Sequence, residues 1–237
     1  MSNFFKKEIQ FIVMLLAINS GDSFAGLVVL NHSLISHHLS IIRDKKTKSY
    51  DFKKSLKKIS KALIYEAAKD LPVVSINVKT PVGNAKCKCI DLKSNIIVVS
   101  ILRAGLGISS VAESIIPNTE TYHLGMKRDE KTHEVSLYYN NFPKAFKNKK
   151  VFVCDPMLAT GGSIYEAIKL LTQRGIKAEN IVCVCIVSAP EGVKRISEAF
   201  PGVKIITAVL DEKLNENAYI VPGLGDAGDR YFNALNF

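Results

Sequence analysis

A loop with one carboxylate, two hydroxyls and two adjacent glycines separates a strand-like run from a helix-like run in VFVCDPMLATGGSIYEA, residues 151–167. Residues 160–163 (TGGS) occupy the predicted start of the helix, where free backbone N–H groups and the helix dipole favour an anion. The glycines let the chain approach a phosphate without Cβ contacts, and Asp155 at the strand tip could accept hydrogen bonds from sugar hydroxyls. A helix N-cap by Ser163 would explain the serine, but neither the glycine pair nor the aspartate. The loop therefore suits a phosphorylated ribose.

Two further segments place glycines beside charged residues. Residues 101–107 (ILRAGLG) follow an apolar run, so Arg103 offers a bidentate cation for phosphate next to glycines that permit close backbone approach. Alone this is a weak signal, because a strand-to-helix turn often needs a glycine. Residues 219–230 (YIVPGLGDAGDR) also combine glycines with charged side chains, although a bare surface turn would have a similar composition.

The elements that must position these loops have the pattern of a parallel α/β sheet. Four apolar runs rich in β-branched residues are typical of buried strands, and helix-like stretches at 164–174 and 193–200 separate the last three. The four runs are 95–102, 151–154, 181–188 and 203–210. This order predicts a central, mostly parallel sheet flanked by helices and joined by right-handed crossovers. Ligands of such sheets bind outside the carboxyl ends of the strands, where we expect the loops to lie.

Length and charge are compatible with one globular domain that binds an anion. The 237 residues with 47% hydrophobic content can bury a large core, and the net charge of +10 suits phosphates or nucleic acid. Part of this charge is local, because residues 43–61 carry nine basic and two acidic side chains. Phe52, Leu56, Ile59 and Leu63 recur there at helical spacing, which predicts an amphipathic helix with a solvated lysine face in a helical N-terminal arm. A nucleic-acid patch is the alternative.

The five cysteines, at 87, 89, 154, 183 and 185, are odd in number and form no C-x-x-C pair. Two C-x-C pairs lie in apolar runs, where strand geometry puts both thiols on one face. We expect small buried hydrophobic residues of a reduced compartment, not zinc ligands or a disulfide framework. The five histidines show no metal-ligand spacing, so we predict no metal held by protein side chains alone.

Residues 1–27 have a different character from the rest. Lys6 and Lys7 precede an apolar stretch at 11–18 and a Ser-Phe-Ala sequence that ends at Ala25, which is the outline of a secretory signal peptide. The apolar stretch is too short to span a bilayer. A disordered extension, or a translation start assigned too far upstream, would leave a similar pattern. We expect a cytoplasmic protein, because unpaired cysteines argue against export.

Residues 151–163 (VFVCDPMLATGGS) resemble the phosphoribosyl-diphosphate signature of type I phosphoribosyltransferases, in the form DPMLATG found in uracil phosphoribosyltransferases. Residues 101–107 and 219–230 resemble two further blocks of that family in the right order, and residues 29–47 resemble its opening. The likeness covers residues 28–237, which would form a single phosphoribosyltransferase domain after the leader 1–27.

The resemblance implies that uracil and 5-phosphoribosyl diphosphate (PRPP) give UMP and diphosphate, with Mg²⁺ carried by the diphosphate. It implies catalytic roles for Asp155, Arg128 and Asp226. The PRPP-binding residues that it implies are Arg103, Arg128, Asp155, Pro156, Met157, Leu158, Ala159, Thr160, Gly161, Gly162, Ser163 and Asp226. The uracil-binding residues that it implies are Ile220, Gly225, Asp226 and Ala227. It also implies a homo-oligomer and GTP as a candidate effector, with neither nucleic acid nor membrane as a partner.

A pyrimidine-responsive RNA-binding regulator on the same fold is the alternative function, because the charge of +10 and the lysine-rich helix would serve RNA. The complete YIVPGLGDAGDR loop favours the enzyme. The same loop argues against a purine phosphoribosyltransferase, whose base site would be expected to use aromatic stacking and different contacts.

Overall fold

The computed structural model describes residues 24–94, 96–128, 135–146 and 149–234. One main sheet has the strand order β1-β10-β9-β7-β4-β5-β6, with β8 paired to β9. All neighbouring strands are parallel except β5 and β6. The strands are β1 (Leu27–Val29), β4 (Ile96–Leu102), β5 (Thr119–Arg128), β6 (Val135–Asn140), β7 (Lys150–Cys154), β8 (Met157–Leu158), β9 (Ile181–Ser188) and β10 (Lys204–Leu210). The predicted fold class is confirmed.

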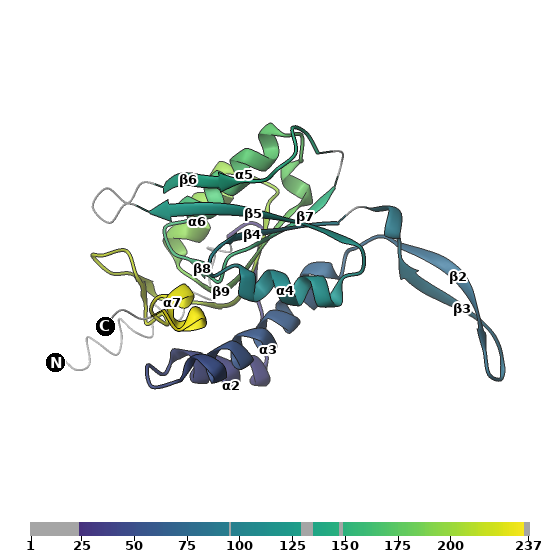
Figure 1. The fold of residues 1–237 in the computed structure, drawn as a ribbon, viewed down its shortest axis with the longest axis horizontal. Coiled ribbons are helices and arrows are strands. Elements are labelled where there is room, and N and C mark those ends of the chain that lie inside the picture. Colours follow the sequence, from purple (N-terminus) through teal and green to yellow (C-terminus); the bar gives the residue numbers. More distant parts are fainter. Residues whose placement is uncertain (1–23, 95, 129–134, 147–148, 235–237) are drawn as a thin grey trace, which may run out of the picture.

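Helices cover both faces of the sheet (Figure 1). One face packs against α2 (Ser33–Arg43), α3 (Ser49–Ala68), α4 (Leu106–Ile115) and α7 (Ala227–Phe232). The other face packs against α5 (Gly162–Gln173) and α6 (Pro190–Ala199). Because both faces are covered, the central strand β9 is buried along its whole length. Its apolar sequence IVCVCIVS is what such a position requires.

The helical N-terminal arm is confirmed as α2 and α3. The four apolar residues that predicted an amphipathic helix, Phe52, Leu56, Ile59 and Leu63, are at most 1% exposed. The leader prediction falls mostly on residues 1–23, which lie outside the described residues. The predicted domain start at residue 28 falls inside β1, whose first residue is Leu27. No helix within the described ranges is long and apolar enough to cross a membrane.

A hairpin that sequence analysis did not predict projects from the body of the protein (Figure 1). Strands β2 (Val73–Thr80) and β3 (Gly83–Ile90) pair only with each other. Ile76 lies opposite Cys87, and Val74 lies opposite Cys89. The two thiols are half-buried. The expectation that all five cysteines are buried is therefore wrong for this pair and holds for the other three.

Short elements complete the chain. Strands β11 (Lys213–Leu214) and β12 (Ile220–Val221) form a small antiparallel pair that follows β10. Two 3-10 turns, Leu92–Ser94 and Ala178–Asn180, precede β4 and β9. Strand β12 lies within the glycine-rich segment 219–230.

The difference in thiol burial predicts two classes of reactivity. Under native conditions, a thiol reagent such as Ellman's reagent should label Cys87 and Cys89 rapidly. The three buried thiols, at 154, 183 and 185, should react only when the protein unfolds. A Cys87→Ser/Cys89→Ser variant is the control and should show no rapid phase. Rapid labelling of a third thiol in the folded protein would contradict the described packing.

Candidate active site

A cavity of about 630 Å³ lies at the carboxyl edge of the main sheet. Three chain segments form most of its wall: the loop from β7 into α5, the end of the β11–β12 turn, and residues 225–228. This volume is in the range of small-molecule pockets, about 300–1,000 Å³. The position is the one expected for a ligand of a parallel sheet.

The start of α5 lies in the cavity wall and has no side-chain cap. The N-cap residue is Gly161, whose φ of +77° is in the left-handed region, and no side chain caps the helix. The first-turn N–H groups and the positive end of the helix dipole therefore remain available to a ligand. Thr160 and Ser163 line the same cavity, and neither side chain forms a hydrogen bond with another described residue. The residues predicted to bind phosphate thus lie together at an uncapped helix start, and their binding of phosphate stays a prediction.

Helix α6 supports this loop from behind. A Cβ atom on Gly192 would lie 2.3 Å from the Ala159 carbonyl oxygen, so only glycine allows this approach. Arg195 Nη1 lies 3.4 Å from the Thr160 carbonyl oxygen and donates a hydrogen bond to it. The same guanidinium lies 4.9 Å from the centre of the Tyr165 ring. The loop thus rests on a packed helix.

Asp155 follows β7 directly, and its side chain faces the cavity. The pKa of this carboxyl is raised to about 7, mainly by burial and to a lesser degree by the negative charge of Asp226, and a hydrogen bond from Met157 N opposes the rise. That bond has a length of 3.3 Å and goes to Asp155 Oδ1. The ionised carboxylate is therefore poorly compensated by the protein alone. Sugar hydroxyls, or a cation arriving with a substrate, would stabilise its charged form.

Asp226 has a structural contact as well as a place in the cavity wall. Its Oδ1 accepts a hydrogen bond of 2.8 Å from Asp229 N and caps α7. The side chain is otherwise exposed, and Oδ2 has no hydrogen-bond partner among the described residues. One oxygen thus holds the loop, and the other is available to a ligand.

The two arginines predicted to bind PRPP are not among the described residues that line the cavity. Arg103 is exposed at the rim beside Ala104, which lines the cavity, and its Nη2 lies 2.7 Å from Asp229 Oδ1. Arg128 is the last residue of β5, next to residues 129–134, which lie outside the described ranges. Its role stays a prediction.

The cavity brings together most of the predicted site residues. Those that line it are Asp155, Met157, Leu158, Ala159, Thr160, Gly161, Gly162, Ser163, Ile220, Gly225, Asp226 and Ala227. Pro156 is buried behind the wall, where its carbonyl oxygen accepts hydrogen bonds from Ile186 N and Val187 N.

Sequence reasoning missed several lining residues, namely Ala104, Val135, Ile164, Asn217, Ala218, Tyr219 and Gly228. Tyr219 and Gly228 belong to the glycine-rich segment 219–230, so that segment could have suggested them. Asn217, Ala218 and Val135 carry no sequence signal of their own, because only the folding of a turn and of β6 brings them to the cavity.

The described wall contains two carboxylates and no lysine or arginine. Nor do the described residues anywhere contain a cluster of three or more His, Cys, Asp or Glu that could hold a metal ion. Asp155 and Asp226 could supply one or two ligands to Mg²⁺, which commonly completes its coordination with substrate phosphates and water. The carboxylates therefore fit a cation that arrives with its own phosphate ligands.

Comparisons with known proteins agree with this geometry. The family model for uracil phosphoribosyltransferase matches residues 29–234. The uracil phosphoribosyltransferase of Clostridium botulinum is 45% identical over 87% of this chain and 97% of its own length, and that of Clostridium beijerinckii is 47% identical over the same shares. A solved structure, the AQ2163 protein from Aquifex aeolicus, has a TM-score of 0.81 at 38% identity and covers 89% of this chain and 100% of its own.

The fold defines an α/β protein of the type I phosphoribosyltransferase class, with a cavity at the carboxyl edge of a mostly parallel sheet. Within that class, the chain belongs to the uracil phosphoribosyltransferase family.

The raised pKa of Asp155 predicts a pH-dependent stability. Because the folded state binds this proton more tightly than the unfolded chain, the carboxyl destabilises the fold as pH rises from about 4 through about 7. Asp155→Asn removes that penalty, so its free energy of unfolding should exceed that of the wild type by up to about 4 kcal/mol at pH 8. At pH 4 the two should nearly coincide. Urea unfolding of the ligand-free proteins at both pH values measures the difference, and an equal offset at both would contradict the assignment.

Proposed function

We propose that this protein is a uracil phosphoribosyltransferase that forms UMP and diphosphate from uracil and PRPP, in a pathway of pyrimidine salvage. The observation that carries the proposal is one cavity in which an uncapped helix N-terminus and Asp155 face the glycine-rich segment at 225–228. A phosphate site, a ribose site and a base site are then contiguous. The names of the relatives support the choice of uracil.

The phosphate side of the cavity would hold PRPP. The first-turn N–H groups of α5, with the hydroxyls of Thr160 and Ser163, would bind the 5′-phosphate. Asp155 would accept hydrogen bonds from the ribose hydroxyls. Met157, Leu158, Ala159, Gly161 and Gly162 would supply the remaining wall of the PRPP site.

The base side would hold uracil. Ile220, Gly225 and Ala227 line it, and the glycine allows the backbone to reach the edge of a pyrimidine. A backbone N–H facing O4 and a carbonyl facing N3–H would accept uracil and mispair with cytosine, at a cost of about 1–3 kcal/mol per unpaired buried group. This contrast would make the enzyme selective.

The chemistry needs placement and charge stabilisation more than a covalent nucleophile. N1 of uracil loses its proton to water or to the departing diphosphate and forms a bond to C1 of the ribose. The bond from C1 to the diphosphate oxygen breaks at the same carbon, and diphosphate leaves with the electron pair. The ribose passes through an oxocarbenium-like state, so holding the base in line contributes directly to the rate. Arg103 and Arg128 would bind the departing diphosphate. Mg²⁺, where bound, would neutralise negative charge on the diphosphate, with Asp155 and Asp226 as its protein ligands.

Formation of UMP from uracil and PRPP by the purified protein tests the proposal directly. Product should appear with stoichiometric diphosphate and only when both substrates are present. Absence of UMP across a range of Mg²⁺ concentrations would overturn it. The family resemblance also supports a cytoplasmic homo-oligomer and GTP as an effector, which gel filtration and a GTP titration of the rate would test.

A substitution in the loop before α5 tests the proposed phosphate site through the kinetics. Gly161→Val places a branched side chain at a φ of +77° beside the phosphate site, so KM for PRPP should rise by about tenfold or more, and KM for uracil should rise much less. Gly202→Val is the matched control, because Gly202 also has a positive φ (+100°) but lies outside the cavity. It should lower the melting temperature without changing either KM. An equal rise of both KM values in Gly161→Val would point to general misfolding.

The two roles of Asp226 can be separated by a pair of variants. Asp226→Asn keeps an acceptor for Asp229 N and should keep the stability of the wild type. Asp226→Ala loses the cap and should lose about 1 kcal/mol of stability. If the carboxylate acts on substrate, both variants lose most of their UMP synthesis. Wild-type turnover in the Asn variant would show that the cap is the whole role.

A further inference from the structure

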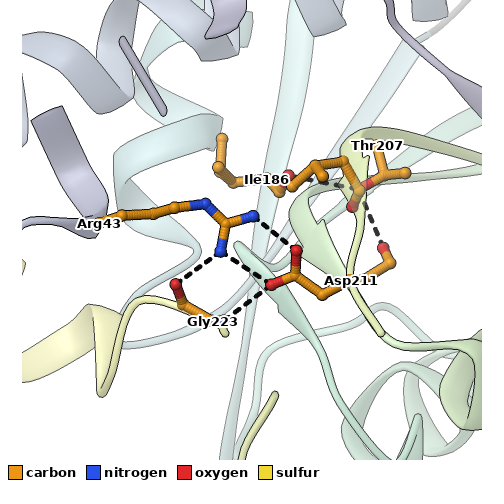
Figure 2. A network of polar contacts seen from close by, with 7 residues as sticks. Arg43, Ile186, Thr207, Asp211 and Gly223 are labelled. Atoms are coloured by element: carbon orange, nitrogen blue, oxygen red, sulfur yellow. Dashed lines mark hydrogen bonds and ion pairs between the residues drawn. The ribbon is translucent and has the colours of Figure 1, made fainter. Parts of the chain in front are cut away.

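The backbone on the base side of the cavity is held from outside by a closed network of hydrogen bonds (Figure 2). Gly223 N donates to Asp211 Oδ2 at 2.8 Å, and the Gly223 carbonyl oxygen accepts from Arg43 Nη1, also at 2.8 Å. Both polar groups of this one residue are thereby fixed. Gly223 has a φ of +59°, and a Cβ atom there would lie 2.1 Å from the Ile220 carbonyl oxygen. The turn between Ile220 and Gly225 therefore has little freedom to move.

The centre of the network is a partly buried ion pair. Arg43 Nη1 lies 3.0 Å from Asp211 Oδ2, and Arg43 Nη2 contacts Asp211 Oδ1, so the pair is bidentate. The Asp211 side chain is only 3% exposed, and that of Arg43 is 24% exposed. A bidentate pair at such burial has a fixed geometry, because water competes weakly for its donors and acceptors.

The network joins elements that are far apart in sequence. Arg43 is the last residue of α2, and Asp211 follows β10. Asp211 N donates to the Ser188 carbonyl oxygen at 2.8 Å, which ties the carboxylate to the end of β9. Arg230 adds a second support, since its Nη1 donates to the Leu224 carbonyl oxygen at 2.6 Å. The base-side turn is thus anchored to the rigid edge of the sheet and to the N-terminal helical arm.

We propose that Arg43 and Asp211 are positioning residues that fix the backbone of the base-side turn and thereby set the affinity for uracil and its preference over cytosine. Neither residue lines the cavity, so they act through Gly223 and its neighbours. Backbone groups can discriminate a carbonyl from an amino group only while their orientation is fixed, because a peptide free to rotate can present a donor or an acceptor. The inference rests on the proposed function, since it assumes that the turn binds the base.

Arg43→Lys is the first test. It keeps the positive charge beside Asp211 but loses the planar guanidinium group that also donates to the Gly223 carbonyl oxygen. We expect KM for uracil to rise about tenfold and the preference for uracil over cytosine in kcat/KM to fall, with KM for PRPP changed by less than about twofold. Lys204→Met is the matched control. Lys204 is the first residue of β10, at the end of the strand opposite Asp211, and its side chain is 34% exposed. The substitution breaks the ion pair between Lys204 and Asp70 and should change neither KM.

A double variant separates positioning from stability. Arg43→Met/Asp211→Leu removes both charges together, so no unpaired charge is left buried. The N–H and carbonyl groups of Gly223 lose their partners, but the melting temperature should fall less than in Arg43→Met or Asp211→Leu alone. On our inference, KM for uracil remains raised in the double variant although it is more stable than either single variant. The inference would be overturned if the double variant and Arg43→Lys both kept a normal KM for uracil and a normal preference for uracil over cytosine. Equal rises of KM for uracil and KM for PRPP would also overturn it. If the wild-type protein formed no UMP, the proposed function itself would fail instead.

Discussion

Close backbone approach at the carboxyl edge of the sheet is the constraint on which the site depends. A Cβ atom on Gly105 would lie 2.3 Å from the Cys154 carbonyl oxygen, and one on Gly192 would lie 2.3 Å from that of Ala159. These two contacts bring the turn after β4 against the end of β7, and the first turn of α6 against the loop that follows β7. Each approach needs a residue without a side chain, so both positions require glycine.

The charge of the cavity wall differs from that of the whole protein. The protein has a net charge of +10, yet the described cavity wall contains Asp155 and Asp226 and no lysine or arginine. If the cavity binds PRPP as proposed, the phosphate would depend on oriented N–H groups of α5 and on rim cations such as Arg103. Several of the lysines instead lie on the exposed face of α3, at 54, 57, 58 and 61. On the proposed function, overall charge would favour approach of an anionic substrate, and local dipoles would determine where its phosphate binds.

The parts of this structure that sequence could predict are those with a strong local pattern. Residues 181–188 form β9 with the predicted bounds, because an apolar run of that length can be stable only inside a covered sheet. The hairpin of β2 and β3 was missed, although it alternates apolar and polar residues, because nothing in the pattern shows whether another element covers it. For the same reason the half-exposed Cys87 and Cys89 were taken as buried. The site loops were predictable from glycines next to charged residues, but the pair of Arg43 with Asp211 joins residues 168 apart and has no local signal.

Helix α6 shows how the phosphate and base sides are kept in one geometry. Gly192 and Arg195 contact the phosphate loop, and Glu191 Oε1 accepts a hydrogen bond of 3.0 Å from Leu214 N in β11. The same helix therefore holds the wall expected to bind PRPP and the strand pair that carries the base-side turn. Because these contacts come from its first two turns, a displacement of α6 would move both walls together. The separation of the two walls thus depends on one helix, which would suit the proposed in-line attack at a single ribose carbon.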